Sequence, residues 1–150
     1  MSFWKIFRGN KKYVEQERKE TAHQALVAEA MILTMACIAE ADGRVDDAEL
    51  AKMAQVYGRV TGTQAEPDRI QAVVEDALKA KGSIEELLLK RAKKMESTDK
   101  ANLIHAGVLI AIVDDNFDVS EQSEIWRLGN ALGVSSKGMK DIIKRAKKAY

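Results

Sequence analysis

Asp42-Gly43-Arg44-Val45-Asp46-Asp47-Ala48-Glu49 is an acidic motif that recurs 72 residues later as Asp114-Asp115-Asn116-Phe117-Asp118-Val119-Ser120-Glu121. Both copies read Asp-x-x-apolar-Asp-x-x-Glu. An apolar run precedes each copy, over residues 30–39 and 103–113, and the apolar positions that follow the two copies keep the same spacing. A duplicated unit of helix, acidic loop and helix is the simplest explanation of such a repeat.

The composition favours helix throughout the chain. Its 150 residues include one proline and nine glycines, and no segment alternates β-branched or aromatic residues with polar ones as a strand would. Hydrophobic residues make up 46% and charged residues 31%, which is typical of a soluble globular domain with a buried core. We predict an all-α fold: a compact bundle of seven to eight helices built from two pseudo-symmetric helix–acidic loop–helix repeats.

The predicted organisation is a single helical domain that follows a short N-terminal segment. Residues 1–20 are basic and aromatic, and residues 21–150 make up the helical domain. Within it, the units 22–61 and 99–133 are expected to pack about a pseudo-two-fold axis, with residues 62–98 as the bridge between them.

Capping residues predict where the helices begin. Asp46 with Glu49, and Ser83 with Glu86, have the spacing of capping boxes, so helices are expected to start near residues 47 and 84. Pro67 suits the first turn of another helix. Further helices are expected to be capped by Ser97-Thr98-Asp99 and by Ser135 or Ser136.

The acids of the repeated motif are candidate metal ligands. Divalent cations need clustered oxygen ligands, because several carboxylates must replace the lost hydration shell. Each motif offers two loop aspartates and one glutamate in the first turn of the next helix. Calcium is therefore expected rather than zinc, and the candidate ligands are Asp42, Asp46, Glu49, Asp114, Asp118 and Glu121.

Helix capping is the alternative interpretation of the same acids. Asp46 and Asp118 are placed to cap the helices that follow, with Glu49 and Glu121 completing the boxes, and such a cap contributes about 1 kcal/mol. Capping gives no role to the first aspartate of each motif, and the two interpretations are compatible. The motif is not an EF-hand, because that loop needs twelve residues with its last ligand at position 12.

Charge is distributed unevenly along the chain. The net charge is +1, but the middle of the chain is acidic and both ends are basic. The aromatic and basic residues 1–13 suit either a peripheral membrane contact or docking on the bundle itself. The basic C-terminal helix suits either solvent or an anionic partner, and nucleic acid is not expected because no recognised motif is present.

A cytoplasmic protein is expected from the remaining features. The one cysteine, Cys37, lies in an apolar run and is interpreted as a small buried hydrophobe. The N-terminus lacks the pattern of a signal peptide, and the apolar runs are shorter than the ~20 residues of a spanning helix. His105, within an apolar helix, is interpreted as a core histidine.

The two motifs and their order resemble the TerB family of tellurite-resistance proteins. The resemblance rests on Ile38 to Glu49, on residues 114–121 with the apolar positions that follow, and on the opening Met1-Ser2-Phe3-Trp4. It implies a duplicated helical fold and a cytosolic protein of tellurite and general stress resistance. It also implies an acidic surface that binds metal at the six acids named above. The implied partners are membrane-bound proteins such as TerC. Asp115 stands where the family usually has glycine, so the second site is expected to be more acidic or differently shaped.

The resulting hypothesis is a non-enzymatic, TerB-like stress protein. Its two acidic loops bind divalent cations, and it associates with a membrane-bound resistance complex at the inner face of the membrane. No nucleophile with an identifiable base and no phosphate-binding loop is present in the sequence, so an enzyme is not expected. The alternative is a helical adaptor whose acidic face binds a protein partner without metal.

Overall fold

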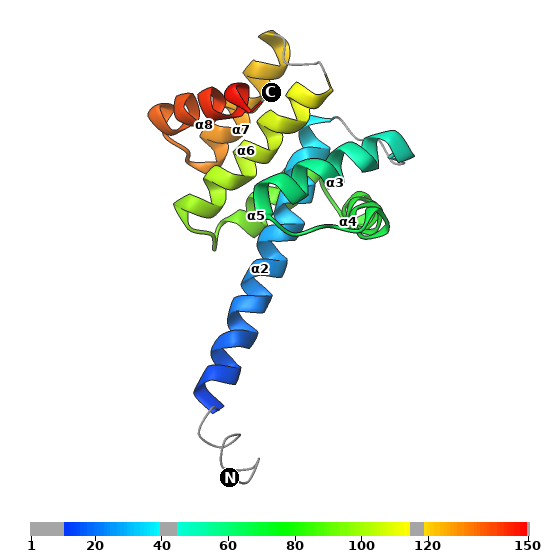
Figure 1. Ribbon diagram of the computed structural model, residues 1–150, viewed down its shortest axis with the longest axis vertical. Coiled ribbons are helices and arrows are strands. Elements are labelled where there is room, and N and C mark those ends of the chain that lie inside the picture. Colours follow the sequence, from blue (N-terminus) through cyan, green and yellow to red (C-terminus); the bar gives the residue numbers. More distant parts are fainter. Residues whose placement is uncertain (1–10, 40–44, 115–118, 150) are drawn as a thin grey trace.

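The computed structural model describes the backbone of residues 11–39, 45–114 and 119–149, with side chains over 21–39, 45–114 and 122–149 (Figure 1). The described backbone contains seven helices and no strand, which confirms the all-α prediction. They are α2 (Lys11–Ile38), α3 (Asp47–Thr61), α4 (Pro67–Lys79), α5 (Ile84–Ala92), α6 (Ser97–Val113), α7 (Val119–Leu132) and α8 (Ser136–Lys148).

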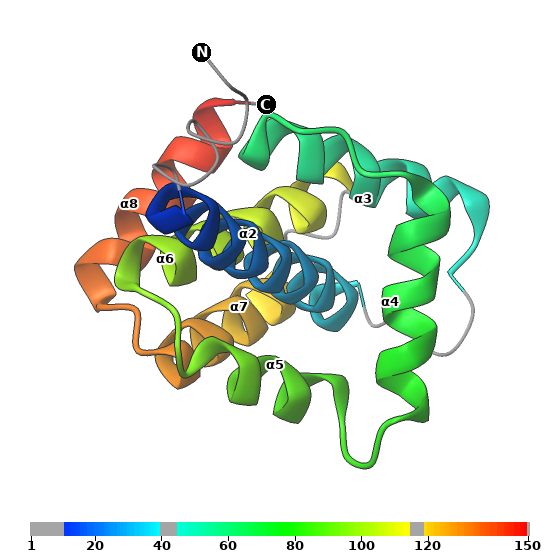
Figure 2. The same ribbon diagram turned by 90° about the horizontal axis from the view of Figure 1, so that it is seen from below.

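Helix α2 is the central element of the fold. Its C-terminal half packs against α6, α5, α4, α3 and α7, so that the other helices surround it (Figure 2). Its N-terminal half extends beyond the bundle (Figure 1). The buried part begins at Ala28 and continues to Ile38. The hydroxyl of the buried Thr34 is satisfied by donating to the Ala30 carbonyl at 2.8 Å.

Helix α6 is the second central helix, and it crosses α2 closely. It is buried on nearly every face from Leu103 to Ala111. At the crossing, a Cβ atom placed on Gly107 would lie 3.3 Å from Ile38 Cγ1 and 3.4 Å from Thr34 Cγ2. Glycine therefore permits the close approach of the two helices near their C-terminal ends.

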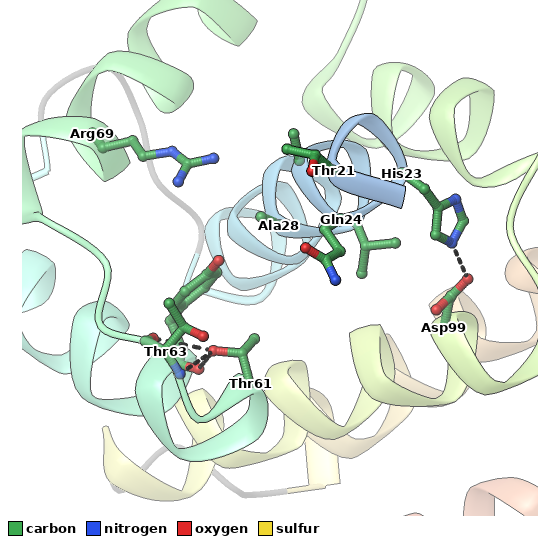
Figure 3. Close-up of a pocket in the computed structure, with 11 residues that line it drawn as sticks. Thr21, His23, Gln24, Ala28, Thr61, Thr63, Arg69 and Asp99 are labelled. Atoms are coloured by element: carbon green, nitrogen blue, oxygen red, sulfur yellow. Dashed lines mark hydrogen bonds and ion pairs between the residues drawn. The ribbon is translucent and has the colours of Figure 1, made fainter. Parts of the chain in front are cut away.

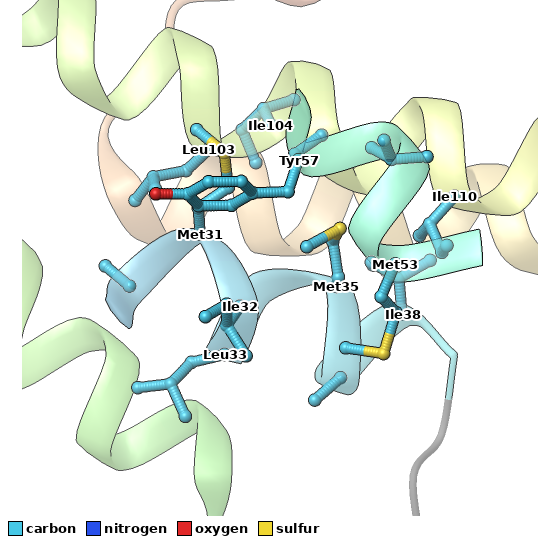
Figure 4. Close-up of a cluster of buried hydrophobic side chains, with 14 of the residues drawn as sticks. Met31, Ile32, Leu33, Met35, Ile38, Met53, Tyr57, Leu103, Ile104 and Ile110 are labelled. Atoms are coloured by element: carbon cyan, nitrogen blue, oxygen red, sulfur yellow. The ribbon is translucent and has the colours of Figure 1, made fainter. Parts of the chain in front are cut away.

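One apolar core joins the helices. Side chains of α2, α3 and α6 interdigitate at its centre (Figure 4). Burial of this apolar surface is the main stabilising term of such a bundle. The labelled core residues are Met31, Ile32, Leu33, Met35, Ile38, Met53, Tyr57, Leu103, Ile104 and Ile110.

Most of the predicted helix starts are confirmed. Asp46, Ser83 and Ser135 each accept a hydrogen bond from the backbone N–H three residues ahead, at 2.8, 3.1 and 3.0 Å. The prediction for α6 was wrong by one residue, because its N-cap is Glu96. The Asp99 carboxylate accepts the Glu96 backbone N–H at 3.3 Å, and Ser97 is thereby the first residue of the helix.

The buried half of α2 is long and apolar. The segment Thr21–Ile38 spans 18 residues with a mean hydropathy of 1.4, so by length and composition it passes as a membrane-spanning helix. A core helix passes the same test, and half of this segment is buried inside the protein.

The pseudo-two-fold relation between units 22–61 and 99–133 stays a prediction.

Candidate cation-binding site

Both acidic motifs follow the C-terminal ends of the two central helices. Helix α2 ends at Ile38 and α6 ends at Val113, and both ends lie at the same end of the molecule (Figure 1). Unsatisfied carbonyls make the C-terminus of a helix partly negative, and this charge favours nearby cations. Two helix ends with the same partial charge therefore lie at this end of the molecule, and Asp114 directly follows one of them.

The described part of the first motif is built on the start of α3. Val45 is buried, and it anchors the backbone just before α3 begins. The next residue, Asp46, is exposed, and its Oδ1 accepts the Glu49 backbone N–H at 2.8 Å. Asp46 is thus a helix cap, as the capping interpretation predicted. One such bond uses a single acceptor position of a carboxylate that has about four, so the cap leaves acceptor capacity for a ligand.

The second motif begins at Asp114, the C-cap residue of α6. Its backbone N–H donates to the Ile110 carbonyl at 3.1 Å, which fixes it to the helix end. Its Oδ1 lies 2.9 Å from Lys52 Nζ, and the Asp114 side chain is only 16% exposed. Because Lys52 belongs to α3, this ion pair connects the helix of the first unit to the motif of the second.

Sequence reasoning missed Lys52, although the repeat contained a signal. Lys52 stands 72 residues before Glu124, so the two units carry opposite charges at this matched position. An acid in one copy and a base in the other suggests that the base has an acidic partner in the duplicated structure. The structure identifies that partner as Asp114.

The other candidate ligands lie outside the described side chains. Asp42 and Asp118 fall in undescribed segments, and Glu121 lies in α7 with its side chain undescribed. Among the residues that the structure describes, no group of three or more His, Cys, Asp or Glu side chains could hold a metal ion. The assignment of all six acids as ligands therefore stays a prediction.

A second charged cluster lies between α5 and α7. Arg127 Nη1 donates to Glu85 Oε2 at 3.1 Å, and the same guanidinium also binds Glu124. These hydrogen bonds raise the pKa of Arg127 and lower the pKa of Glu124. The arrangement joins the two helices by a charge-assisted contact that the sequence analysis did not predict.

Cys37 lies half-buried near this cluster. Burial raises the pKa of its thiol to about 12, and the nearby Glu85 carboxylate acts in the same direction. The thiol is consequently protonated at neutral pH and is a poor nucleophile. Its packing against the core agrees with its interpretation as a small hydrophobe.

A cleft of about 450 Å³ lies around the point where α2 leaves the bundle (Figure 3). On one side of α2, His23 Nε2 lies 3.0 Å from Asp99 Oδ2. Arg69, from α4, lies on the other side (Figure 3). Because Asp99 also accepts the Glu96 N–H, the His23 contact attaches α2 to the start of α6.

Comparison with known proteins identifies one family. The family model described as "Tellurite resistance protein TerB" matches residues 28–144. The matched region runs from the buried half of α2 to the last turns of α8, and so includes both acidic motifs. No curated protein and no solved structure matches the chain.

Proposed function

The chain belongs to the TerB family of tellurite-resistance proteins, and on this premise we propose that it is a non-enzymatic stress-resistance protein that binds divalent cations at its acidic end. Calcium is the proposed ion, because the candidate ligands are all carboxylates. The proposed location is the cytoplasm, at the inner face of the membrane, where the protein associates with a membrane-bound complex of the TerC type.

The contact between Lys52 and Asp114 is the observation that carries the proposal. Asp114 already holds a cation, the Lys52 ammonium, at 2.9 Å. The carboxylate lies at the end of α6, where the helix dipole adds negative charge. A divalent ion at this place would gain from the same carboxylate and the same helix end, together with the remaining acids of the motifs.

A binding role, as opposed to catalysis, is supported by the state of the described groups. Asp46 caps a helix and Asp114 is ion-paired. The pKa of about 12 keeps the Cys37 thiol protonated at neutral pH. None of these three groups has the environment of an activated acid, base or nucleophile.

The test is a calcium titration of the chelator-stripped protein, followed by calorimetry and by backbone amide shifts. The expected result is saturable binding with shifts confined to residues 42–49 and 114–121. The double variant Asp42→Asn/Asp114→Asn should lose binding while the Asp46 cap remains. The matched control is Asp76→Asn/Asp141→Asn, which removes two exposed acids elsewhere and should bind as the parent does. Unchanged binding by the first double variant would refute the ligand assignment.

A basic protein partner is the second candidate for the acidic end. The Lys52 ammonium shows the chemistry that such a partner would use, since a lysine or arginine of another chain can bind these carboxylates as Lys52 does. Capture of a TerC-type partner in the presence of chelator, and its loss in Asp42→Asn/Asp114→Asn, would favour the adaptor. Capture that requires calcium would favour the metal-dependent proposal.

A further inference from the structure

A basic groove with an apolar floor lies between α7 and α8. Its volume is about 350 Å³. Trp126 of α7 and Ile143 of α8 form the floor, and both are half-buried against the core. Gln122 and three lysines of α8 complete the lining, and none of the described lining residues is acidic.

The three lysines form one row along α8. Lys140, Lys144 and Lys147 are spaced i, i+4 and i+7, so they project from the same face of the helix. Met139, Ile142 and Ala146, on the opposite face, hold α8 in the core. The helix thus presents a row of lysine side chains beside the half-buried Trp126, and this combination suits a ligand with both an anionic and an apolar part.

The size of the groove limits the kind of ligand. Two turns of an α-helix fill roughly 850 Å³, since a helix is at least about 10 Å wide and rises 5.4 Å per turn. A groove of about 350 Å³ encloses only part of such a segment. It falls instead at the small end of the range for small-molecule sites, roughly 300–1,000 Å³.

We propose that this groove binds one anionic phospholipid, with the phosphate between Lys140 and Lys144 and the first part of the acyl chain on Trp126 and Ile143. Lysine ammonium groups bind phosphate as point charges, and the indole ring suits the boundary between polar and apolar groups. The proposed lipid contacts include none of the six candidate cation ligands. The test of the lipid site therefore succeeds or fails independently of the cation proposal.

Trp126 supplies the signal for the experiment. The chain has two tryptophans, so the variant Trp4→Phe leaves Trp126 as the only one. The probe is dihexanoyl phosphatidylglycerol below its aggregation concentration, which presents single lipids and no membrane surface. The expected result is a saturable blue shift of Trp126 emission. Two comparison ligands are glycerol 3-phosphate, which lacks the chains, and dihexanoyl phosphatidylcholine, which lacks the net charge. Each should bind at least tenfold more weakly.

The variants separate charge from packing. In the Trp4→Phe background, Lys140→Gln/Lys144→Gln should weaken binding roughly tenfold to thirtyfold, as expected for two lysines near an anionic lipid. The matched control Lys79→Gln/Lys81→Gln removes two exposed lysines elsewhere and should leave affinity unchanged. Ile143→Ala tests the apolar floor and should weaken the lipid while leaving glycerol 3-phosphate unaffected. Thermal melts confirm that each variant is folded.

Several outcomes would overturn the proposal. Equal affinity for phosphatidylcholine would show that charge is irrelevant, and equal affinity for glycerol 3-phosphate would show a plain anion site. Undiminished binding by Lys140→Gln/Lys144→Gln would place the lipid elsewhere.

The last comparison measures binding to vesicles of phosphatidylglycerol. Binding to vesicles but not to single lipids would replace the groove by a diffuse electrostatic contact. A Trp126 response to an acidic amphipathic peptide alone would indicate a protein partner.

Discussion

Lys52 Nζ lies 2.9 Å from Asp114 Oδ1, and this contact links α3 in the first unit to the acidic motif of the second. The lysine is 41% exposed and the aspartate 16%. Water therefore screens the ammonium more than the carboxylate. The pair contributes at most about 1 kcal/mol to stability, because partly exposed ion pairs gain little over solvated charges. Its larger consequence concerns any cation that binds at Asp114, since Lys52 competes for the same oxygen.

The variant Lys52→Met should raise the calcium affinity of the acidic end. Removing one positive charge a few ångströms from a divalent ion lowers the repulsion by about 1–2 kcal/mol in a largely aqueous setting, which corresponds to roughly tenfold in affinity. Calorimetry of the chelator-stripped variant measures the change. Lys90→Met, an exposed lysine on α5, is the control and should have no effect. A lower affinity in Lys52→Met would show that the lysine organises the site and does not compete for it.

Two substitutions at Asp46 should separate its structural role from its proposed ligand role. Asp46→Ala removes the hydrogen bond to the Glu49 N–H and should cost about 1 kcal/mol of unfolding free energy. Asp46→Asn keeps a good cap without the charge, so it should retain stability and weaken calcium binding. Chemical denaturation and calorimetry give the two quantities. If Asp46→Asn binds calcium as tightly as the parent, Asp46 acts only as a cap.

The helical fold was readable from the sequence because its signals are local. Asp46, Ser83 and Ser135 bind backbone groups three residues away, so spacing alone identifies them. The N-cap of α6 was missed because glutamate is a less common cap than the serine beside it. The apolar runs before the two motifs correctly marked α2 and α6 as the buried central helices.

The partners in the charged contacts were not readable, because they lie far apart in the chain. The opposite charges at the matched positions 52 and 124 marked Lys52 but did not identify Asp114 as its partner. Lys52 meets Asp114, and Arg127 meets Glu85. Which of the 24 basic side chains meets which of the 23 acidic ones depends on how the helices pack, and periodicity carries no such information. The basic groove was likewise not predictable, because it also depends on how the helices pack. The lysine row of α8 was visible in the sequence, but its position beside Trp126 was not.

His105 should make the stability of the protein depend on pH near neutrality. Burial lowers its pKa below 6.5, and Arg145 and Arg59 act in the same direction. The unfolded chain therefore binds a proton more readily than the folded one. Stability should fall as pH decreases from about 7 through 6.5 toward the folded pKa, and it should be unaffected by this group at higher pH. Urea denaturation between pH 5.5 and 7.5 measures the slope. The variant His105→Phe should flatten it, whereas a slope unchanged in His105→Phe would assign the pH dependence to other groups.

Cys37 should react with thiol reagents only when the protein unfolds. With its pKa raised to about 12, the folded thiol has on the order of a thousandfold less thiolate at pH 8 than an ordinary cysteine of pKa about 8.5–9. Reaction with Ellman's reagent should therefore be slow in buffer and rapid in denaturant. The variant Cys37→Ser gives the blank, because Cys37 is the single cysteine. Reaction in buffer at the rate of a free cysteine would mean that α2 separates from the helices packed around it often enough to expose the thiol.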